Sequence, residues 1–435
     1  MRFSTKTLGC KVNQYETHAI EKILFQHGHK LVNPGEGCDI CIINTCAVTE
    51  ESVRKSKQAI RRMQKLEPDA LIAVSGCFSQ LDSEEVAKLG VDLISGASGR
   101  EKFALQVENL KSSRAFTVYK EPPCIFEELS PGSAMNRTRA LLKIQDGCDN
   151  YCAYCIVPYA RGHSRSLKLD RMEEYAKLIE EQGYKEIVIT GIEISSYGRD
   201  IIPPSSSPFS LLPSPSLITA IQTIQSAAPN ARLRLGSLDP TIMTDEFCAK
   251  LSEIPNMCNH FHLSLQSGCD ETLQRMGRKY ETNRVQKAIF SLRKYFSNCG
   301  ITADLITGFP GETDDEFGKT LIFINQAAFS AMHIFPYSPR PGTRAADMPG
   351  QVKKDIRKER ARIAIETAGI LTQSFKQNQI EKTARVLFEQ VRNGYSSGYS
   401  ENYIEIYVKD KIEKNNVCNT RIKSIKNGLL TGEIV

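Results

Sequence analysis

The stretch Gly147-Cys148-Asp149-Asn150-Tyr151-Cys152-Ala153-Tyr154-Cys155 decides how the central part of this 435-residue chain is interpreted. It carries three cysteines in the spacing CxxxCxxC, with an aromatic residue before the last one. Three thiolates on one short loop suit a [4Fe–4S] cluster. They leave one of the irons without a protein ligand, as a catalytic metal site requires. A zinc site is the alternative, and His163 is the nearest candidate for its fourth ligand.

The sequence around this loop alternates between strand-like and helix-like runs from about residue 134 to residue 345. Helical runs such as Asp170–Gln182 and Asn283–Phe296 separate the strands, and Thr313 with Glu316 forms a capping-box pattern. Six such units predict a barrel or partial barrel whose site lies at the carboxyl ends of its strands. The six predicted strands are Leu141–Gln145, Glu186–Gly191, Arg232–Ser237, His260–Gln266, Ile301–Gly308 and Ala331–Pro336.

Before this region, the first 110 residues or so read as strands and helices in the order βαβαβ, which predicts a parallel sheet covered by helices. Cys10, Cys46 and Cys77 each stand at the carboxyl end of a separate predicted strand. In a parallel sheet these ends share one edge, where such folds bind ligands. We therefore expect the three cysteines to meet, and three merely buried cysteines are the alternative. Cys38 and Cys41 form a CxxC. Cys38 begins the predicted strand that Cys46 ends, and Cys41 lies inside that strand, so we interpret both as structural.

Composition limits the class of protein. Apolar residues make up 41% of the chain, charged residues 24%, and the net charge is +6. No apolar run is long enough to cross a membrane, and the first residues lack the apolar core of a signal peptide. We therefore expect a cytoplasmic protein, in which 14 cysteines do not form a disulfide framework.

Two regions are candidates for binding RNA. Arg54, Lys57, Arg61 and Lys65 share one face of a predicted helix, which could hold phosphates or simply be solvated. Residues 372–435 carry ten Lys and Arg against seven Asp and Glu. Their short strand-like runs predict a small β-barrel, on which Tyr395 and Tyr399 could stack on bases or pack internally. The predicted strands are Ala384–Gln390, Asn402–Lys409, Cys418–Ile425 and Leu429–Val435.

The cysteine loop on the first unit of a six-unit barrel resembles the radical S-adenosylmethionine (SAM) superfamily. That resemblance implies that Cys148, Cys152 and Cys155 hold a [4Fe–4S] cluster whose open iron binds SAM. The stretches Thr190-Gly191-Ile192-Glu193 and Gly308-Phe309-Pro310-Gly311 match loops that hold SAM in that superfamily. The implied SAM contacts are Tyr154, Gly191, Glu193, Ser237, Gln266, Gly308 and Pro310.

The whole chain resembles the methylthiotransferases. The resemblance implies a second, auxiliary [4Fe–4S] cluster on Cys10, Cys46 and Cys77, which delivers sulfur, and no side chain acting as acid or base. It also implies a multidomain α/β fold: an N-terminal parallel α/β domain over residues 1–112, a radical SAM partial (βα)6 TIM-like barrel over 134–365, and an OB-like antiparallel β-barrel of the TRAM type over 372–435.

Within this family, the stretches Thr7–Glu16 and Leu233–Pro240 resemble the branch that acts on tRNA carrying N6-threonylcarbamoyladenosine. This implies conversion of that nucleoside, at position 37 of the anticodon loop, to its 2-methylthio derivative. The implied partners are a tRNA anticodon stem-loop and an electron donor such as flavodoxin or ferredoxin, and a monomer with no membrane partner is expected. The branches that act on isopentenyladenosine in tRNA or on a ribosomal protein are alternatives.

A protein of another class, a non-catalytic iron–sulfur RNA-binding or electron-transfer protein, is a further alternative. An electron carrier should ligate its cluster fully, and a loop of three cysteines argues against that. The Pro- and Ser-rich stretch over residues 201–216 is interpreted as a surface insertion.

Overall fold

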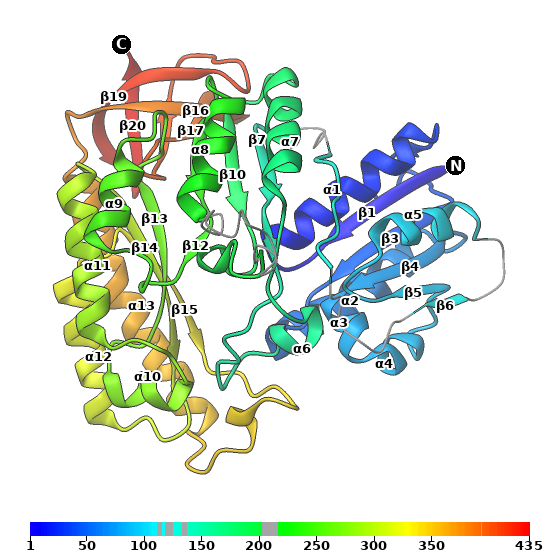
Figure 1. The fold of residues 1–435 in the computed structure, drawn as a ribbon, viewed down its shortest axis with the longest axis horizontal. Helices are drawn as coiled ribbons and strands as arrows, with labels where there is room; N and C mark the ends of the chain where they lie inside the picture. The colour runs from blue at the N-terminus through cyan, green and yellow to red at the C-terminus, as the bar shows by residue number, and fades with distance from the viewer. Residues whose placement is uncertain (111–114, 118–124, 133–136, 202–215, 393) are drawn as a thin grey trace, which may run out of the picture.

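The computed structural model describes residues 1–110, 115–117, 125–132, 137–201, 216–392 and 394–435. Along the chain it forms an N-terminal α/β unit, a central unit of strands and helices, and a small C-terminal barrel (Figure 1). Within these ranges no helix combines the length and the apolar character needed to cross a lipid bilayer. The Pro- and Ser-rich stretch lies almost entirely outside the described residues.

The N-terminal unit is a parallel sheet of six strands in the order β2-β1-β3-β4-β5-β6. The predicted βαβαβ order is confirmed, and the additional strands β2, β5 and β6 are only two or three residues long. β6 lies beyond residue 112, so this sheet extends past the boundary expected from the sequence. The strands are β1 (Arg2–Thr7), β2 (Lys30–Leu31), β3 (Ile40–Thr45), β4 (Leu71–Gly76), β5 (Leu93–Ser95) and β6 (Ala115–Thr117).

Helices cover both faces of this sheet, which is why β3 is an unbroken apolar run that is buried along its whole length. α1 and α5 pack on one face, and α2, α3 and α4 pack on the other. Thr49 caps α2 by accepting a hydrogen bond from the backbone of Ser52. The helices are α1 (Lys11–Gln26), α2 (Glu50–Leu66), α3 (Cys77–Leu81), α4 (Ser83–Ala87) and α5 (Arg100–Glu108).

The central unit contains the six predicted parallel strands, and the third is divided in two at Gly236. The strands form two hydrogen-bonded groups, β11-β10-β7 and β12-β13-β14-β15, so the barrel is open. The strands of these two groups are β7 (Arg139–Lys143), β10 (Glu186–Thr190), β11 (Arg232–Leu235), β12 (Ser237–Leu238), β13 (His260–Gln266), β14 (Gly300–Thr307) and β15 (Ala331–Pro336). After β7, the short strands β8 (Gln145–Asp146) and β9 (Arg165–Ser166) form an antiparallel pair.

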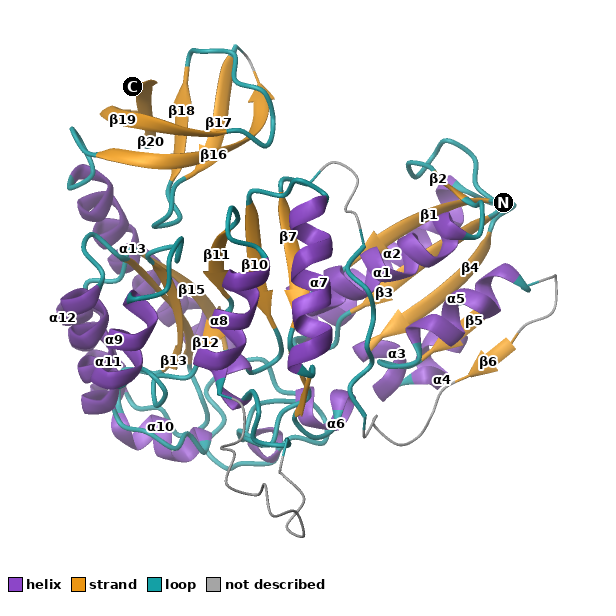
Figure 2. Cartoon of the chain, turned by 45° about the horizontal axis from the view of Figure 1, so that its top comes forward, coloured by secondary structure: helices purple, strands orange, loops and turns teal. Residues whose placement is uncertain are grey.

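Helices line the outer side of these strands, and the largest apolar core of the protein lies between the two layers (Figure 2). Thr313 and Glu316 form the predicted capping box at the start of α12. The helices are α6 (Val157–Arg161), α7 (Leu169–Glu181), α8 (Leu217–Ala227), α9 (Asp245–Ser252), α10 (Asp270–Met276), α11 (Thr282–Tyr295) and α12 (Asp314–Ala327), with single turns η1 (Ile194–Ser196) and η2 (Arg344–Ala346).

The long helix α13 (Lys354–Gln377) leads into a closed barrel of five strands in the order β16-β17-β18-β20-β19. One pairing, β18 with β20, is parallel, and the others are antiparallel. Residues 395–399, which the sequence placed between strands, form β17. Its small central residues give no apolar alternation to detect. The strands are β16 (Thr383–Arg392), β17 (Tyr395–Tyr399), β18 (Glu405–Val408), β19 (Val417–Lys426) and β20 (Leu429–Ile434).

This barrel sits at the amino ends of the central strands, on the side away from the cysteine loop (Figure 1). Arg232 and Arg234 of β11 are buried there, and both donate hydrogen bonds to Glu186 of β10. Their remaining N–H groups donate to backbone carbonyls of Arg385, Tyr399, Ser400 and Glu401, at 2.8–3.1 Å. A buried ion cluster therefore joins the two units.

Candidate active site

The cysteine loop leaves the end of β8 through a turn that requires glycine. Gly147 has φ +72°, and a Cβ there would lie 1.9 Å from the carbonyl oxygen of His163. Ala153 anchors the loop, because its N–H donates to Met276 at 2.8 Å and its carbonyl accepts from Ala345 at 2.8 Å. Cys148, Cys152 and Cys155 are thereby held at the carboxyl ends of the strands, as predicted.

The three thiols of this loop lie near one another in a largely desolvated place. Burial, with a smaller contribution from the neighbouring Cys152, raises the pKa of Cys148 to about 11 and that of Cys155 to about 12. The guanidinium of Arg278 donates to the sulfur of Cys152 at 3.3 Å. Such thiols ionise when a cationic metal centre compensates for their desolvation.

The zinc alternative requires several ligands around one ion. Among the described residues, no group of three or more His, Cys, Asp and Glu side chains is close enough to hold one metal ion. The cysteines of an iron–sulfur cluster bind different irons, so they stand farther apart than the ligands of one zinc ion. His163, the proposed fourth zinc ligand, instead pairs with Asp149 at 2.6 Å.

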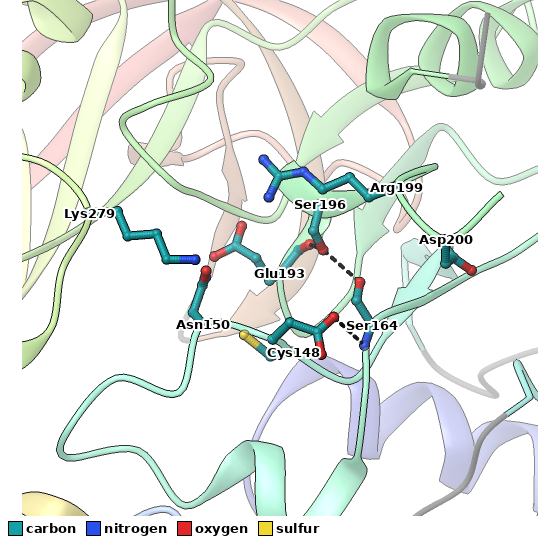
Figure 3. A pocket seen from close by; sticks show the side chains of 9 residues that line it. Cys148, Asn150, Ser164, Glu193, Ser196, Arg199, Asp200 and Lys279 are labelled. Atoms are coloured by element: carbon teal, nitrogen blue, oxygen red, sulfur yellow. Dashed lines mark hydrogen bonds between the residues drawn. The ribbon is translucent and has the colours of Figure 1, made fainter. Parts of the chain in front are cut away.

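Beside Cys148 lies a cavity of about 140 Å³ (Figure 3). Glu193, Asn150 and Lys279 reach into it from different loops, next to the sulfur of Cys148. Burial, together with the nearby charge of Asp239, raises the pKa of Glu193 to about 7. The complete lining is Cys148, Asp149, Asn150, Ser164, Glu193, Ser196, Arg199, Asp200 and Lys279. Its mixture of carboxylates and cations suits a zwitterionic ligand that carries both an ammonium and a carboxylate group.

The structure brings some of the other predicted cofactor residues to this region. Tyr154 packs edge-on against Phe309, with ring centroids 6.4 Å apart, so the Gly308–Gly311 turn meets the cysteine loop. The carbonyl of Pro310 in this turn accepts from Arg275 at 3.2 Å. Gly191 stands against Gln145, the residue that orients the Glu193 loop. Ser237 and Gln266 lie at the ends of neighbouring strands and do not line the cavity.

Several residues that line the cavity or support its lining were not predicted from the sequence. Gln145 accepts a hydrogen bond from the backbone N–H of Glu193 at 2.8 Å and donates to Ser164 at 2.9 Å. Ser164 in turn is hydrogen-bonded to Ser196 at 2.8 Å. The position of Gln145 at the end of the first barrel strand was an available signal, whereas Arg199 and Lys279 lie on loops without a distinctive pattern.

The second group of cysteines meets at the carboxyl edge of the N-terminal sheet. Cys10 follows β1, Cys46 follows β3, and Cys77 begins α3 directly after β4. Gly9 has φ +94°, and a Cβ there would lie only 2.8 Å from the Cβ of Cys46. Burial of the sulfur raises the pKa of each thiol, although Cys10 as a whole residue is exposed. A neighbouring thiol contributes in the same direction: Cys46 acts on Cys10, Cys77 on Cys46, and Cys10 on Cys77.

This group also fits a cluster with one open side. Cys46 and Cys77 are buried, whereas Cys10 is exposed, so an occupant of the site would remain reachable from outside. Cys38 and Cys41 are separate from this group. Their sulfurs lie 3.4 Å apart and both contact Ser4, as suits structural cysteines.

The residues considered for RNA binding differ in their surroundings. On α2, Arg54 pairs with Glu51 and Lys57 pairs with Glu85, whereas Arg61 and Lys65 are exposed and form no ion pair within the described chain. Tyr395 begins β17 and is 36% exposed. Tyr399, at the other end of β17, is half-buried between Tyr403 and Arg139, at the contact with the central unit.

Comparison with known proteins adds independent findings. Residues 142–324 match the radical SAM superfamily, and residues 2–96 match the uncharacterized protein family UPF0004. The chain is 36% identical to the threonylcarbamoyladenosine tRNA methylthiotransferase MtaB of Thermotoga maritima, over 88% of this chain and 86% of that protein. It is 32% identical to the tRNA-2-methylthio-N(6)-dimethylallyladenosine synthase of Natranaerobius thermophilus, over 90% and 86%.

Among solved structures, the radical S-adenosylmethionine methyltransferase TsrM from Kitasatospora setae, with cobalamin and a [4Fe–4S] cluster bound, resembles this chain with a TM-score of 0.57. The match covers 79% of this chain and 77% of that one, at 15% identity, and it supports the fold.

Proposed function

Because the chain belongs to the family of radical SAM tRNA methylthiotransferases, we propose that it converts N6-threonylcarbamoyladenosine at position 37 of tRNA to its 2-methylthio derivative. The observation that carries the proposal is the pair of three-cysteine groups, each at the carboxyl edge of a parallel sheet, in a chain similar over most of its length to enzymes named for this reaction. Five MtaB relatives are 31–36% identical to it.

In this proposal, Cys148, Cys152 and Cys155 hold the cluster that binds SAM, and Cys10, Cys46 and Cys77 hold the auxiliary cluster. When bound, the first cluster supplies the single electron that cleaves SAM. The chain itself orients SAM: Glu193 binds its ammonium group, and Gln145 holds the Glu193 loop in place. Tyr154 and Phe309 pack beside the cysteine loop and limit the access of water. Cys10 is exposed, and the adenine of the substrate is proposed to approach the auxiliary cluster from this side.

The tRNA anticodon stem-loop is the proposed macromolecular partner. Arg61 and Lys65 of α2 and Tyr395 of the C-terminal barrel are the exposed candidates for contacting it. Arg54 and Lys57 would first have to exchange their carboxylate partners, and Tyr399 would have to leave its contact with Arg139. A flavodoxin or ferredoxin as electron donor, a monomeric state and a cytoplasmic location complete the proposal. The proposed unit boundaries are those given above, with the N-terminal unit extended to include β6.

The proposal is tested by analysing tRNA nucleosides with mass spectrometry in cells that lack this protein. We expect 2-methylthio-N6-threonylcarbamoyladenosine to disappear and its unmodified precursor to accumulate. The wild-type gene should restore the product, and a Cys148→Ala variant should not. If instead only the methylthio derivative of isopentenyladenosine disappears, the substrate is that of the other tRNA branch. If all methylthio nucleosides keep their levels, tRNA is not the substrate.

Replacing Glu193 by glutamine is expected to weaken SAM binding by about 10- to 100-fold, because a charge-assisted hydrogen bond contributes about 1.5–3 kcal/mol. Iron content should not change, since Glu193 is not a proposed cluster ligand. Equilibrium dialysis of anaerobic, reconstituted protein with SAM measures the effect. Glu271→Gln, at an exposed carboxylate paired with Lys319, is the control. Equal affinities of the two variants would remove Glu193 from the proposed site.

A further inference from the structure

A fully buried group of charged side chains lies between the N-terminal and central units. Glu16 of α1 accepts from Arg100 at 2.8 Å and from Arg161 at 2.8 Å. Asp146 of β8 accepts from the same Arg161 at 3.1 Å. Lys143 of β7 lies 3.5 Å from Glu16 and 3.2 Å from Asp146. All five side chains are at most 5% exposed, so water screens these charges little.

Arg161 is the member of this group that reaches the cysteine edge of the N-terminal sheet. Its guanidinium donates to the side-chain oxygen of Asn13 at 2.7 Å. The amide nitrogen of Asn13 donates to the carbonyls of Leu8 and Thr45, at 2.8 and 3.0 Å. Those carbonyls stand just before the Gly9-Cys10 turn and Cys46. Arg161 thus supports the backbone that carries two of the three thiols.

The same arginine comes from the central unit. It ends α6, six positions after Cys155, and α6 lies beside α3, which begins with Cys77 (Figure 1). Arg161 therefore links the segment that carries Cys155 to the backbone that carries Cys10 and Cys46.

The buried group carries too few negative charges for its positive ones. Arg100, Lys143, Arg161 and Arg165, which lies 3.4 Å from Asp146, bring four positive charges, and only two carboxylates, Glu16 and Asp146, pair with them in the described structure. A buried charge without compensation is strongly destabilising. The Nε–H of Arg161 is also buried and has no hydrogen-bond partner within the described chain. The site is therefore suited to receive a further negative charge beside Arg161.

The three thiols are where that charge would reside. The side-chain oxygen of Asn13, which accepts from Arg161 at 2.7 Å, also lies 3.8 Å from the sulfur of Cys10. The helix α6, which ends in Arg161, packs beside α3, which begins with Cys77.

We propose that Arg161 is the positioning residue of the auxiliary cluster: its buried charge balances the anionic cluster that Cys10, Cys46 and Cys77 hold, and raises the reduction potential of that cluster. Net charge and hydrogen bonds around the sulfurs set the potential of an iron–sulfur cluster, because the reduced form carries one more negative charge. The inference rests on the proposed function, since it requires the auxiliary cluster to be present.

The test uses the full chain with Cys148, Cys152 and Cys155 replaced by alanine, so that only the auxiliary cluster is loaded. Its midpoint potential is measured by dithionite titration followed by electron paramagnetic resonance. Arg161→Gln is expected to shift the potential to more negative values, and Glu16→Gln to more positive values. Arg161→Lys, which keeps the charge but loses the forked geometry, should stay near the parent potential even where iron loading falls.

Arg100→Gln is the matched control, because it removes a buried arginine from the same carboxylate, whereas the hydrogen bond to Asn13 beside Cys10 belongs to Arg161. Its shift should be smaller than that of Arg161→Gln. Equal shifts for these two variants, or an unchanged potential in Arg161→Gln, would overturn the inference. Should Arg161→Gln fail to fold, the direction of the Glu16→Gln shift decides, and a negative or absent shift rejects the inference. A parent protein that binds no iron would instead reject the auxiliary cluster of the proposed function.

Discussion

Replacing Cys10, Cys46 and Cys77 together by alanine is expected to lower the iron content of anaerobically reconstituted protein from about eight to about four atoms per chain. The methylthio product should disappear, because this group is the proposed site of sulfur delivery. Cleavage of SAM to 5′-deoxyadenosine should continue, because the loop of Cys148, Cys152 and Cys155 is intact. The two activities are measured in the same reaction by chromatography of nucleosides, with iron and sulfide determined on the same sample.

The chain offers a control with the same number of substitutions. Cys38, Cys41 and Cys258 are also free thiols, and Cys41 and Cys258 are as buried as Cys46 and Cys77. Replacing these three by alanine should leave iron content and product formation near the parent values. If both triple variants lose iron equally, the loss reflects damage to the fold. If neither does, Cys10, Cys46 and Cys77 do not hold a cluster.

The meeting of these cysteines could be predicted because it follows from topology. Residues at the carboxyl ends of β1, β3 and β4 must come together once the strands are parallel neighbours, whatever the intervening sequence. The six strands of the central unit could be predicted for a similar reason, since their apolar runs are long and separated by amphipathic helices. Strands such as β2 and β6 were missed because two or three residues carry no periodicity.

The buried charges could not be predicted from the sequence. Glu16 and Arg161 stand 145 positions apart, and nothing in either neighbourhood distinguishes them from charged residues on a solvated helix face. Tyr399 illustrates the same limit: the sequence left its role open between stacking on a base and internal packing. In the structure its ring stacks on Tyr403 of the same barrel and contacts Arg139 across the unit boundary. Contacts between units depend on side-chain partners that local patterns do not encode.

Replacing Glu186 by glutamine is expected to lower the free energy of unfolding by about 3–5 kcal/mol, because the variant leaves Arg232 and Arg234 buried without their carboxylate. The Glu186 carboxylate is 2.5 Å from Arg232 and 2.7 Å from Arg234, and all three side chains are at most 2% exposed. Urea denaturation followed by circular dichroism measures the loss. Hydrogen exchange should also rise at residues 399–401, whose carbonyls these arginines hold.

The same ion cluster predicts an acid-sensitive junction between the central unit and the C-terminal barrel. Burial alone would raise the pKa of Glu186, but Arg234 and Arg232 lower it to about 2 from an ordinary value of 4.5. A carboxylate with a lowered pKa stabilises the fold above its unfolded pKa, and this stabilisation is lost as the pH falls from about 4.5 toward about 2. The wild-type protein should therefore lose stability in that range more steeply than Glu186→Gln.

Glu389→Gln provides the comparison, because Glu389 also joins the barrel to the central unit, through Arg139 at 2.7 Å. That pair is 14–20% exposed, so solvent screens it and its loss should cost only about 1 kcal/mol. Equal destabilisation by the two substitutions would show that burial does not distinguish the pairs. A Glu186→Gln variant as stable as the wild type would show that the arginines are held by the barrel carbonyls alone. We expect a much larger loss of unfolding free energy for Glu186→Gln than for Glu389→Gln. That order would make the buried ion pairs of Glu186 the main polar contact that holds the barrel at the amino ends of the strands.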